Sequence, residues 1–148
     1  MNLIEHLTMK GELSVVVKDE STGTIKQAFT VPNLVVSVGK AYIASRMVGT
    51  ASNVMSHMAI GTATTTPIVG DTTLGTEAGR VSVSAFTAST NTVTTTATFP
   101  AGTGTGAITE AGILNAASAG SLLCRTTFPV VNKAAGDSIA ITWVVTVS

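Results

Sequence analysis

Apolar and polar residues alternate along most of this chain, which is the pattern of β-strands that bury one face. Two such runs flank the turn ASTN within residues 80–99, and threonines line one face of the second run. The alternation returns at residues 138–148, SIAITWVVTVS, where the one tryptophan of the chain stands near the centre. We therefore predict a hairpin over 80–99 and a central core strand over 138–148.

The rest of the chain repeats this arrangement, with one exception. Residues 11–31 predict a hairpin around DESTGT, residues 107–131 predict another around AASAG, and SHMAIGT predicts a short strand. The exception is NLVVSVGKAYIASRMVG, whose apolar spacing predicts a helix at about 36–48, capped by Ser37 and ended by Gly49. The pattern thus predicts a mainly β fold, an antiparallel β-sandwich (jelly-roll-like) of seven to eight strands with one short α-helix. A small barrel is the alternative.

The organisation of the chain follows from the same pattern. Its 148 residues suffice for one domain with a real core. Residues 1–10 show no clear period, so we predict an N-terminal arm there and a single β-sandwich domain over 11–148. A second irregular stretch, ATTTPIVGDTTLGTEAG, is rich in glycine and threonine and predicts a long loop over residues 62–79.

Long loops and arms in compact proteins commonly make contacts with neighbours. We therefore take both irregular segments as candidate intersubunit contacts. Their apolar members are Leu3, Ile4, Leu7, Pro67, Ile68, Val69 and Leu74.

Composition narrows the classes of partner. Only 11% of the residues are charged and the net charge is zero, which disfavours nucleic acid and anionic membrane surfaces. No apolar run approaches the roughly 20 residues of a membrane helix. The mean hydropathy of +0.47 is high for so few charges, so we expect apolar surface to be buried between copies of the chain. Glu5 and the lack of a basic leading region argue against a secretory signal, which predicts synthesis in the cytoplasm.

Catalytic and cofactor motifs do not stand out in this sequence. It contains no G-x-S-x-G, no phosphate-loop motif and no metal-binding histidine pair, and GTGTG leads into a predicted strand instead of a helix. His6 is expected at the surface and His57 packed or hydrogen-bonded, although two histidines and a carboxylate could in principle hold a metal. Cys124 lies in the apolar run SLLCRTTF and is expected to pack as a small hydrophobe. We predict no catalytic residue, no cofactor and no metal.

One carboxylate is unusual, because Glu110 lies inside the apolar strand AITEAGIL. A buried carboxylate requires a partner, and Arg80 or Arg125 could supply it as a structural ion pair. An acid role or a calcium ligand is the alternative reading of Glu110.

Several stretches, taken together, resemble a set of small virion proteins of tailed bacteriophages. They are NLVVSVGKAYIASRM, MSHMAIGTATTTPIVGDTTLGTEAGR, and GAITEAGILN with the closing GDSIAITW, and they cover roughly residues 33–148. The resemblance implies a non-enzymatic structural protein, and most closely a capsid cement or decoration protein on the capsid surface of the virion. Such proteins bind the major capsid protein as homo-trimers, and the host cytoplasm is where they are made. A tail, baseplate or fibre component is the main alternative, and a carbohydrate-binding sandwich or a small hydrolase is a further one.

Overall fold

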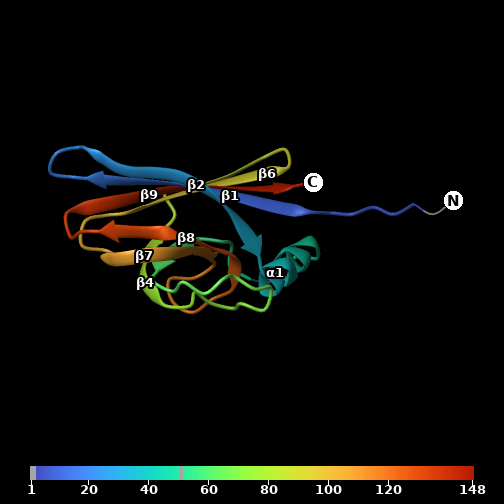
Figure 1. The fold of residues 1–148 in the computed structure, drawn as a ribbon. Coiled ribbons are helices and arrows are strands. Elements are labelled where there is room, and N and C mark those ends of the chain that lie inside the picture. Colours follow the sequence, from blue (N-terminus) through green and yellow to red (C-terminus); the bar gives the residue numbers. More distant parts are fainter. Residues whose placement is uncertain (1–2, 51) are drawn as a thin grey trace.

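The computed structural model describes residues 3–50 and 52–148, which form nine strands and one helix (Figure 1). The elements are β1 (Met9–Asp19), β2 (Ile25–Val35), α1 (Ser37–Met47), β3 (His57–Gly61), β4 (Glu77–Ser82), β5 (Ala85–Ser89), β6 (Thr92–Phe99), β7 (Gly106–Leu114), β8 (Leu122–Lys133) and β9 (Asp137–Val147). All strand pairs are antiparallel. The predicted mainly β, sandwich-like class with one helix is confirmed.

The structure has nine strands where seven to eight were predicted, because the first half of the predicted 80–99 hairpin is divided. The Val83 N–H donates to the Ser56 carbonyl, whereas the Ser84 N–H donates to the Thr96 carbonyl. The chain therefore changes partners between these two residues. β4 pairs with β3, and only β5 forms the hairpin with β6.

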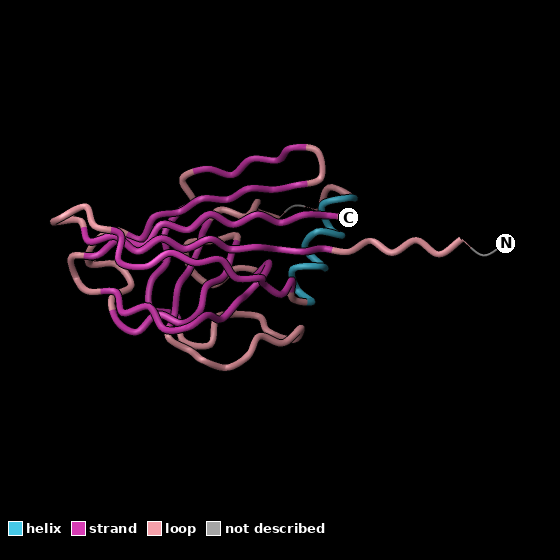
Figure 2. Tube along the Cα trace, turned by 45° about the horizontal axis from the view of Figure 1, so that its top comes forward, coloured by secondary structure: helices cyan, strands magenta, loops and turns pink. Residues whose placement is uncertain are grey.

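The strands form one sheet, in the order β4-β3-β7-β8-β2-β1-β9-β6-β5, which curls into two facing layers (Figures 1 and 2). Strand β2 joins the layers. Its residues from Ile25 to Asn33 pair with β1 in one layer, and Leu34 and Val35 pair with β8 in the other. β2 therefore leaves β1 at Asn33, and the gap that results lies beside the helix that follows.

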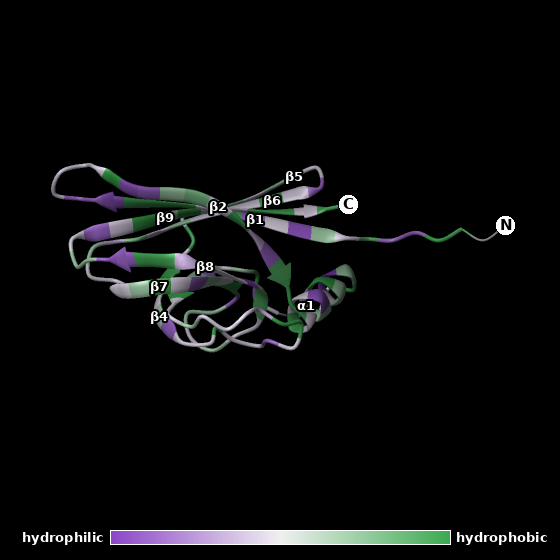
Figure 3. Ribbon diagram, in the orientation of Figure 1, coloured by the Kyte–Doolittle hydropathy of each residue, from purple (hydrophilic) through white to green (hydrophobic). Residues whose placement is uncertain are grey.

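The main core lies between the two layers. Figure 3 shows apolar and polar residues alternating along the strands, as the sequence predicts. Trp143 is fully buried on β9, which lies between β1 and β6. The prediction of a central core strand is confirmed. The core is built from both layers by Leu13, Val15, Val17, Met58, Ile60, Phe99, Ile108, Ile113, Phe128, Val131, Ile139, Ile141 and Trp143.

Helix α1 lies against β8. Gly39 makes this possible, since a Cβ atom at this position would run into the carbonyl group of Leu123. The helix ends as predicted, with Gly49 at φ +68° and its N–H donating to the Arg46 carbonyl. The predicted cap is wrong: the N-cap position is Val36, which makes no side-chain hydrogen bond, and Ser37 is already helical.

Candidate functional site

Glu110 organises the long loop. It lies on β7 with no exposed surface, and its carboxylate accepts three backbone hydrogen bonds from the loop. The donors are the N–H groups of Ala63 (3.2 Å), Gly75 (2.9 Å) and Thr76 (2.7 Å). Because these donors come from both ends of the loop, one buried carboxylate holds the loop closed.

Arg125 on β8 completes the anchor. Its Nε donates to Glu110 Oε2 at 2.9 Å, one of its terminal nitrogens donates to Asp71 Oδ2 at 2.8 Å, and the other donates to the Thr65 carbonyl at 3.1 Å. The side chain is only 2% exposed. The structure thus pairs Glu110 with one of its two predicted partners, and adds Asp71, which the sequence analysis missed.

Arg80, the other predicted partner, does not reach Glu110. It forms an ion pair with Glu77, with distances of 2.8 and 2.6 Å, and donates to the carbonyl groups of Ala116 and Ala119. Arg80 pairs with Glu77, which lies only three residues before it in the chain, and not with Glu110. The prediction of Arg80 as a partner of Glu110 is therefore wrong. We call the group of Glu110, Arg125 and Asp71 with the bound loop backbone the loop anchor.

The loop anchor shifts the pKa of Asp71. Burial alone would raise this pKa, but hydrogen bonds from the Ile68 N–H and the Arg125 guanidinium outweigh burial and hold the pKa of Asp71 below its ordinary value. These hydrogen bonds favour the charged carboxylate, so ionised Asp71 contributes to the closed loop.

A strand irregularity aims Glu110 at the loop. The register of β7 and β8 shifts between Ile108 and Glu110. As a result, the consecutive residues Thr109 and Glu110 both contact Ala63, Thr109 through its hydroxyl group to the carbonyl at 2.8 Å. Regular strand alternation would send these two side chains to opposite faces.

Leu74 closes the loop over the outer face of β3, β7 and β8. It is 5% exposed and packs in a second small core with Ala59, Leu114 and Leu122. Gly112 leaves room for it, since a Cβ atom there would lie 2.6 Å from Leu74 Cδ1. The prediction of Leu74 as an intersubunit contact is therefore wrong, because the long loop has an apolar underside of its own.

The other three predicted contact residues of the loop lie at its tip and remain accessible. Ile68 is 62% exposed and Val69 is 52% exposed, while Pro67 is half-buried. The Val69 carbonyl accepts a hydrogen bond from the Ser37 N–H at 2.7 Å, so the tip is fixed beside the start of α1.

The arm, unlike the loop, is not held against the body. Counting from the N-terminus, Thr8 is the first described residue that forms backbone hydrogen bonds with the body: its N–H donates to the Ser148 carbonyl, and the Ser148 N–H donates to the Thr8 carbonyl. Within the described part of the chain, residues 3–7 make no hydrogen bond to the body, and they continue outward from β1 (Figures 1 and 2). Leu3, Ile4 and Leu7 are 87%, 76% and 75% exposed. Residues 1–2 of the predicted arm lie outside the described residues, and Met9 and Lys10 belong to β1.

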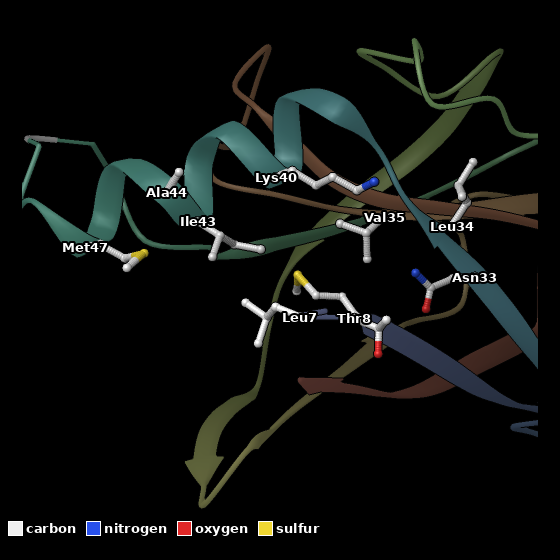
Figure 4. A pocket seen from close by; sticks show the side chains of 10 residues that line it. Leu7, Thr8, Asn33, Leu34, Val35, Lys40, Ile43, Ala44 and Met47 are labelled. Carbon is white, nitrogen blue, oxygen red and sulfur yellow. The ribbon is translucent and has the colours of Figure 1, made fainter. Parts of the chain in front are cut away.

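A pocket of about 480 Å³ lies at the base of the arm (Figure 4). We call it the arm-base pocket. Three segments line it: the arm end and start of β1, the end of β2, and one side of α1. Its residues are Leu7, Thr8, Met9, Asn33, Leu34, Val35, Lys40, Ile43, Ala44 and Met47.

One polar atom at this pocket lacks a partner. The Oδ1 atom of Asn33 accepts a hydrogen bond from Trp143 Nε1 at 2.9 Å. Its Nδ2 atom is buried and has no hydrogen-bond partner among the described residues. Since buried donors are nearly always satisfied in native proteins, Asn33 has an unused donor where β2 leaves β1.

The remaining polar candidates have ordinary structural surroundings. His57 is half-buried, with Nδ1 2.8 Å from Ser56 Oγ and Nε2 3.3 Å from Ser82 Oγ. Cys124 is buried, and this burial raises the pKa of its thiol far above the ordinary value. In residues 3–50 and 52–148, no three His, Cys, Asp or Glu side chains are placed to hold a metal ion. None of the described helices is long and apolar enough to span a membrane.

Comparisons with known proteins add no family. No family model, no curated protein and no solved structure matches this chain.

The candidate site consists of three features described above: the free arm, the arm-base pocket and the fixed loop tip. All three lie on elements around α1.

Proposed function

We propose that this chain is a non-enzymatic structural protein of a tailed-phage virion, and specifically a capsid cement protein. In this proposal it assembles as a homo-trimer, binds the major capsid protein on the capsid surface and stabilises the head lattice. The proposal rests on the sequence resemblance, on the physical character of the exposed apolar segments and on the rigidity of the body that carries them.

The geometry gives the resemblance a physical meaning. The stretches AIGTATTTP and DTTLGTE are neighbours in the sequence and ITEAGI is distant from both, yet each of the three supplies part of the loop anchor. The polar residues that make the resemblance recognisable thus hold a loop in shape. Such a role suits a protein that offers fixed contact surfaces.

The observation that carries the proposal is the exposure of Leu3, Ile4 and Leu7 on an extended arm. Apolar side chains on such a segment favour burial against another chain. A lattice protein sums many such weak contacts through avidity, so that no single contact needs to be strong. Low net charge is compatible with packing against protein surfaces.

Copy number in purified phage particles tests the proposal. Quantitative mass spectrometry is expected to find hundreds of copies of the chain per virion, in a stoichiometric relation to the major capsid protein. A handful of copies would instead indicate a tail, baseplate or fibre component, and absence from particles would overturn the virion assignment.

A matched binding experiment tests the cement role. Purified chain is added to heads that lack it, and head survival is measured on heating or on chelation of divalent cations. Bound chain is expected to raise the temperature at which heads open. Heads that bind the chain with no gain in stability would contradict a cement role.

A further inference from the structure

We propose that the arm-base pocket binds the arm of a second copy of this chain, with residues 3–6 added as a strand beside β1. This inference rests on the proposed self-assembly and names the surface that performs it. The resulting contact is heterologous, since each copy donates its arm to one neighbour and accepts an arm from another. Such contacts close into a ring when the rotation between copies permits it.

The first support is an open strand edge. On one side, β1 pairs with β9 from Met9 onward, and Thr8 extends this pairing to Ser148. On the other side, pairing with β2 begins only at Gly11, opposite Asn33. Met9 and Lys10 therefore have a strand neighbour on one side alone. An extended segment can add at such an edge through backbone hydrogen bonds.

The second support is the space around this edge. The arm-base pocket opens on the face toward α1, and a second hollow on the opposite face is lined by Met9, Lys10, Glu12, Pro32, Asn33 and Val144, among others. A strand placed in the gap would send successive side chains to opposite faces. Both faces thus have room for the side chains of an added strand.

The third support is the match between the arm and the pocket. Alternation puts Leu3 and Glu5 on one face of the arm and Ile4 on the other. Figure 4 shows Ile43, Ala44 and Met47 of α1 on one side of the pocket and Lys40, nearer the start of the helix, beside Val35. An arriving Leu3 would enter the apolar part while Glu5 faces Lys40, which has no ion-pair partner among the described residues.

The fourth support is the unused donor of Asn33. Its buried Nδ2 needs an acceptor at the point where β2 leaves β1. A backbone carbonyl of an added strand becomes such an acceptor when the Asn33 side chain turns toward the gap, since the Nδ2 atom is covered in the free chain.

The arm of the same chain is poorly placed to fill its own pocket. Leu7 and Thr8 already line the pocket at the root of the arm, and the residues before them continue away from the body (Figures 1 and 4). At roughly 3.3 Å per residue, residues 3–7 extend about 16 Å in this direction. That length is sufficient to reach a neighbouring copy.

Blocking the pocket tests the inference. We expect Ala44→Trp, which places a large ring in the pocket, to weaken self-association at least about tenfold in sedimentation equilibrium. Ala41→Trp is the matched control, because Ala41 is an exposed alanine of the same helix that does not line the pocket. Wild-type association in Ala44→Trp would overturn the inference. If the wild-type chain were monomeric at every concentration, the proposed self-assembly would itself be wrong.

A charge exchange tests the same contact with little risk to folding, since Lys40 and Glu5 are both exposed. Lys40→Glu is expected to weaken association about fivefold, and adding Glu5→Lys in the same chain is expected to restore it. Failure of the double variant to recover would exclude the Glu5–Lys40 contact.

Cross-linking between separate chains distinguishes the possible occupants. Chains with Leu3→Cys are mixed with tagged chains carrying Ala44→Cys and then oxidised, and a disulfide-linked mixed dimer is expected on a non-reducing gel. Ile25→Cys, exposed at the far end of β2, replaces Ala44→Cys in the control and should give no mixed dimer. If both cysteines in one chain link only within that chain, the arm fills its own pocket and the inference is wrong.

Discussion

The long loop and the arm differ both in polarity and in how they are held by the rest of the molecule. The loop is polar and rich in threonine and glycine, yet it is held closely against the body, whereas the apolar arm stands free in solvent. The loop is fixed because its backbone N–H groups meet a buried carboxylate, Glu110, and because Leu74 covers an apolar sheet face. The arm is free because a single extended segment has no second layer to pack against. Hydrophobicity alone would have predicted the reverse, with the apolar arm packed against the body and the polar loop exposed.

Removing the centre of the loop anchor is expected to have the largest effect. Glu110→Ala leaves the buried Arg125 Nε–H and three loop N–H groups without their acceptor, so we expect a loss of about 3–5 kcal/mol in the free energy of unfolding. Urea denaturation measures this loss. The control is Lys18→Gln, which removes the exposed ion pair with Glu20 and should cost less than about 1 kcal/mol. Similar losses in the two variants would contradict the role of the loop anchor.

Crowding the loop anchor is expected to have the next largest effect. In Gly61→Ala, the added methyl group would collide with the Thr76 carbonyl and the Glu110 side chain. We expect a loss of about 1–3 kcal/mol, together with faster cleavage of the loop by added protease. Gly70→Ala at the loop tip is the control, since nothing lies within 4 Å of a Cβ atom there. Its stability should be unchanged or slightly higher.

Acid is expected to loosen the loop by a smaller amount. Because the folded state holds the pKa of Asp71 below its ordinary value of 3.8, its contribution is fully present above that value. It is lost as the pH falls through the lowered value. The melting temperature of the wild type should therefore fall more between pH 5 and pH 2 than that of Asp71→Asn. The pKa of Asp137 is also lowered, through its hydrogen bonds to Lys26 and Ala134, but this contribution is common to both proteins. Parallel pH curves would show that Asp71 does not contribute.

Deleting the arm is expected to have the smallest effect on the folded body. A chain that lacks residues 1–7 keeps Thr8 and all of β1, so its unfolding free energy as a monomer should change by less than about 0.5 kcal/mol. Self-association should be lost in sedimentation experiments, although stability is kept. A large loss of stability in the dilute monomer would mean that the arm packs on its own body.

The sequence predicted those features that depend on neighbours along the chain. Alternation located the strands, and Trp143 marked a central strand correctly, because burial of one face shows directly as a period of two. The position of Glu110 within an apolar strand was also enough to predict that it has an arginine partner. Choosing Arg125 over Arg80 required the fold, since the two arginines are equally plausible in sequence.

The missed features all depend on distant segments. The break between Val83 and Ser84 is invisible in an unbroken alternation, because it arises where the chain exchanges one strand partner for another. Leu74 was predicted as an intersubunit contact because it lies in the long loop, but its side chain completes a core formed by four other segments. Asp71 lies in the long loop and Asn33 lies near the end of β2, and neither has sequence neighbours that indicate its contacts.

The continuity of the arm with β1 has a mechanical consequence. A pull on the arm along its own direction would load β1 lengthwise. This strand pairs with β9 from Met9 to Asp19 and with β2 from Gly11 to Lys18. The hydrogen bonds of both ladders would then share the load in shear, instead of opening one after another as in a peeled strand. An arm attached in this way can transmit tension between neighbouring molecules without unravelling the molecule to which it belongs.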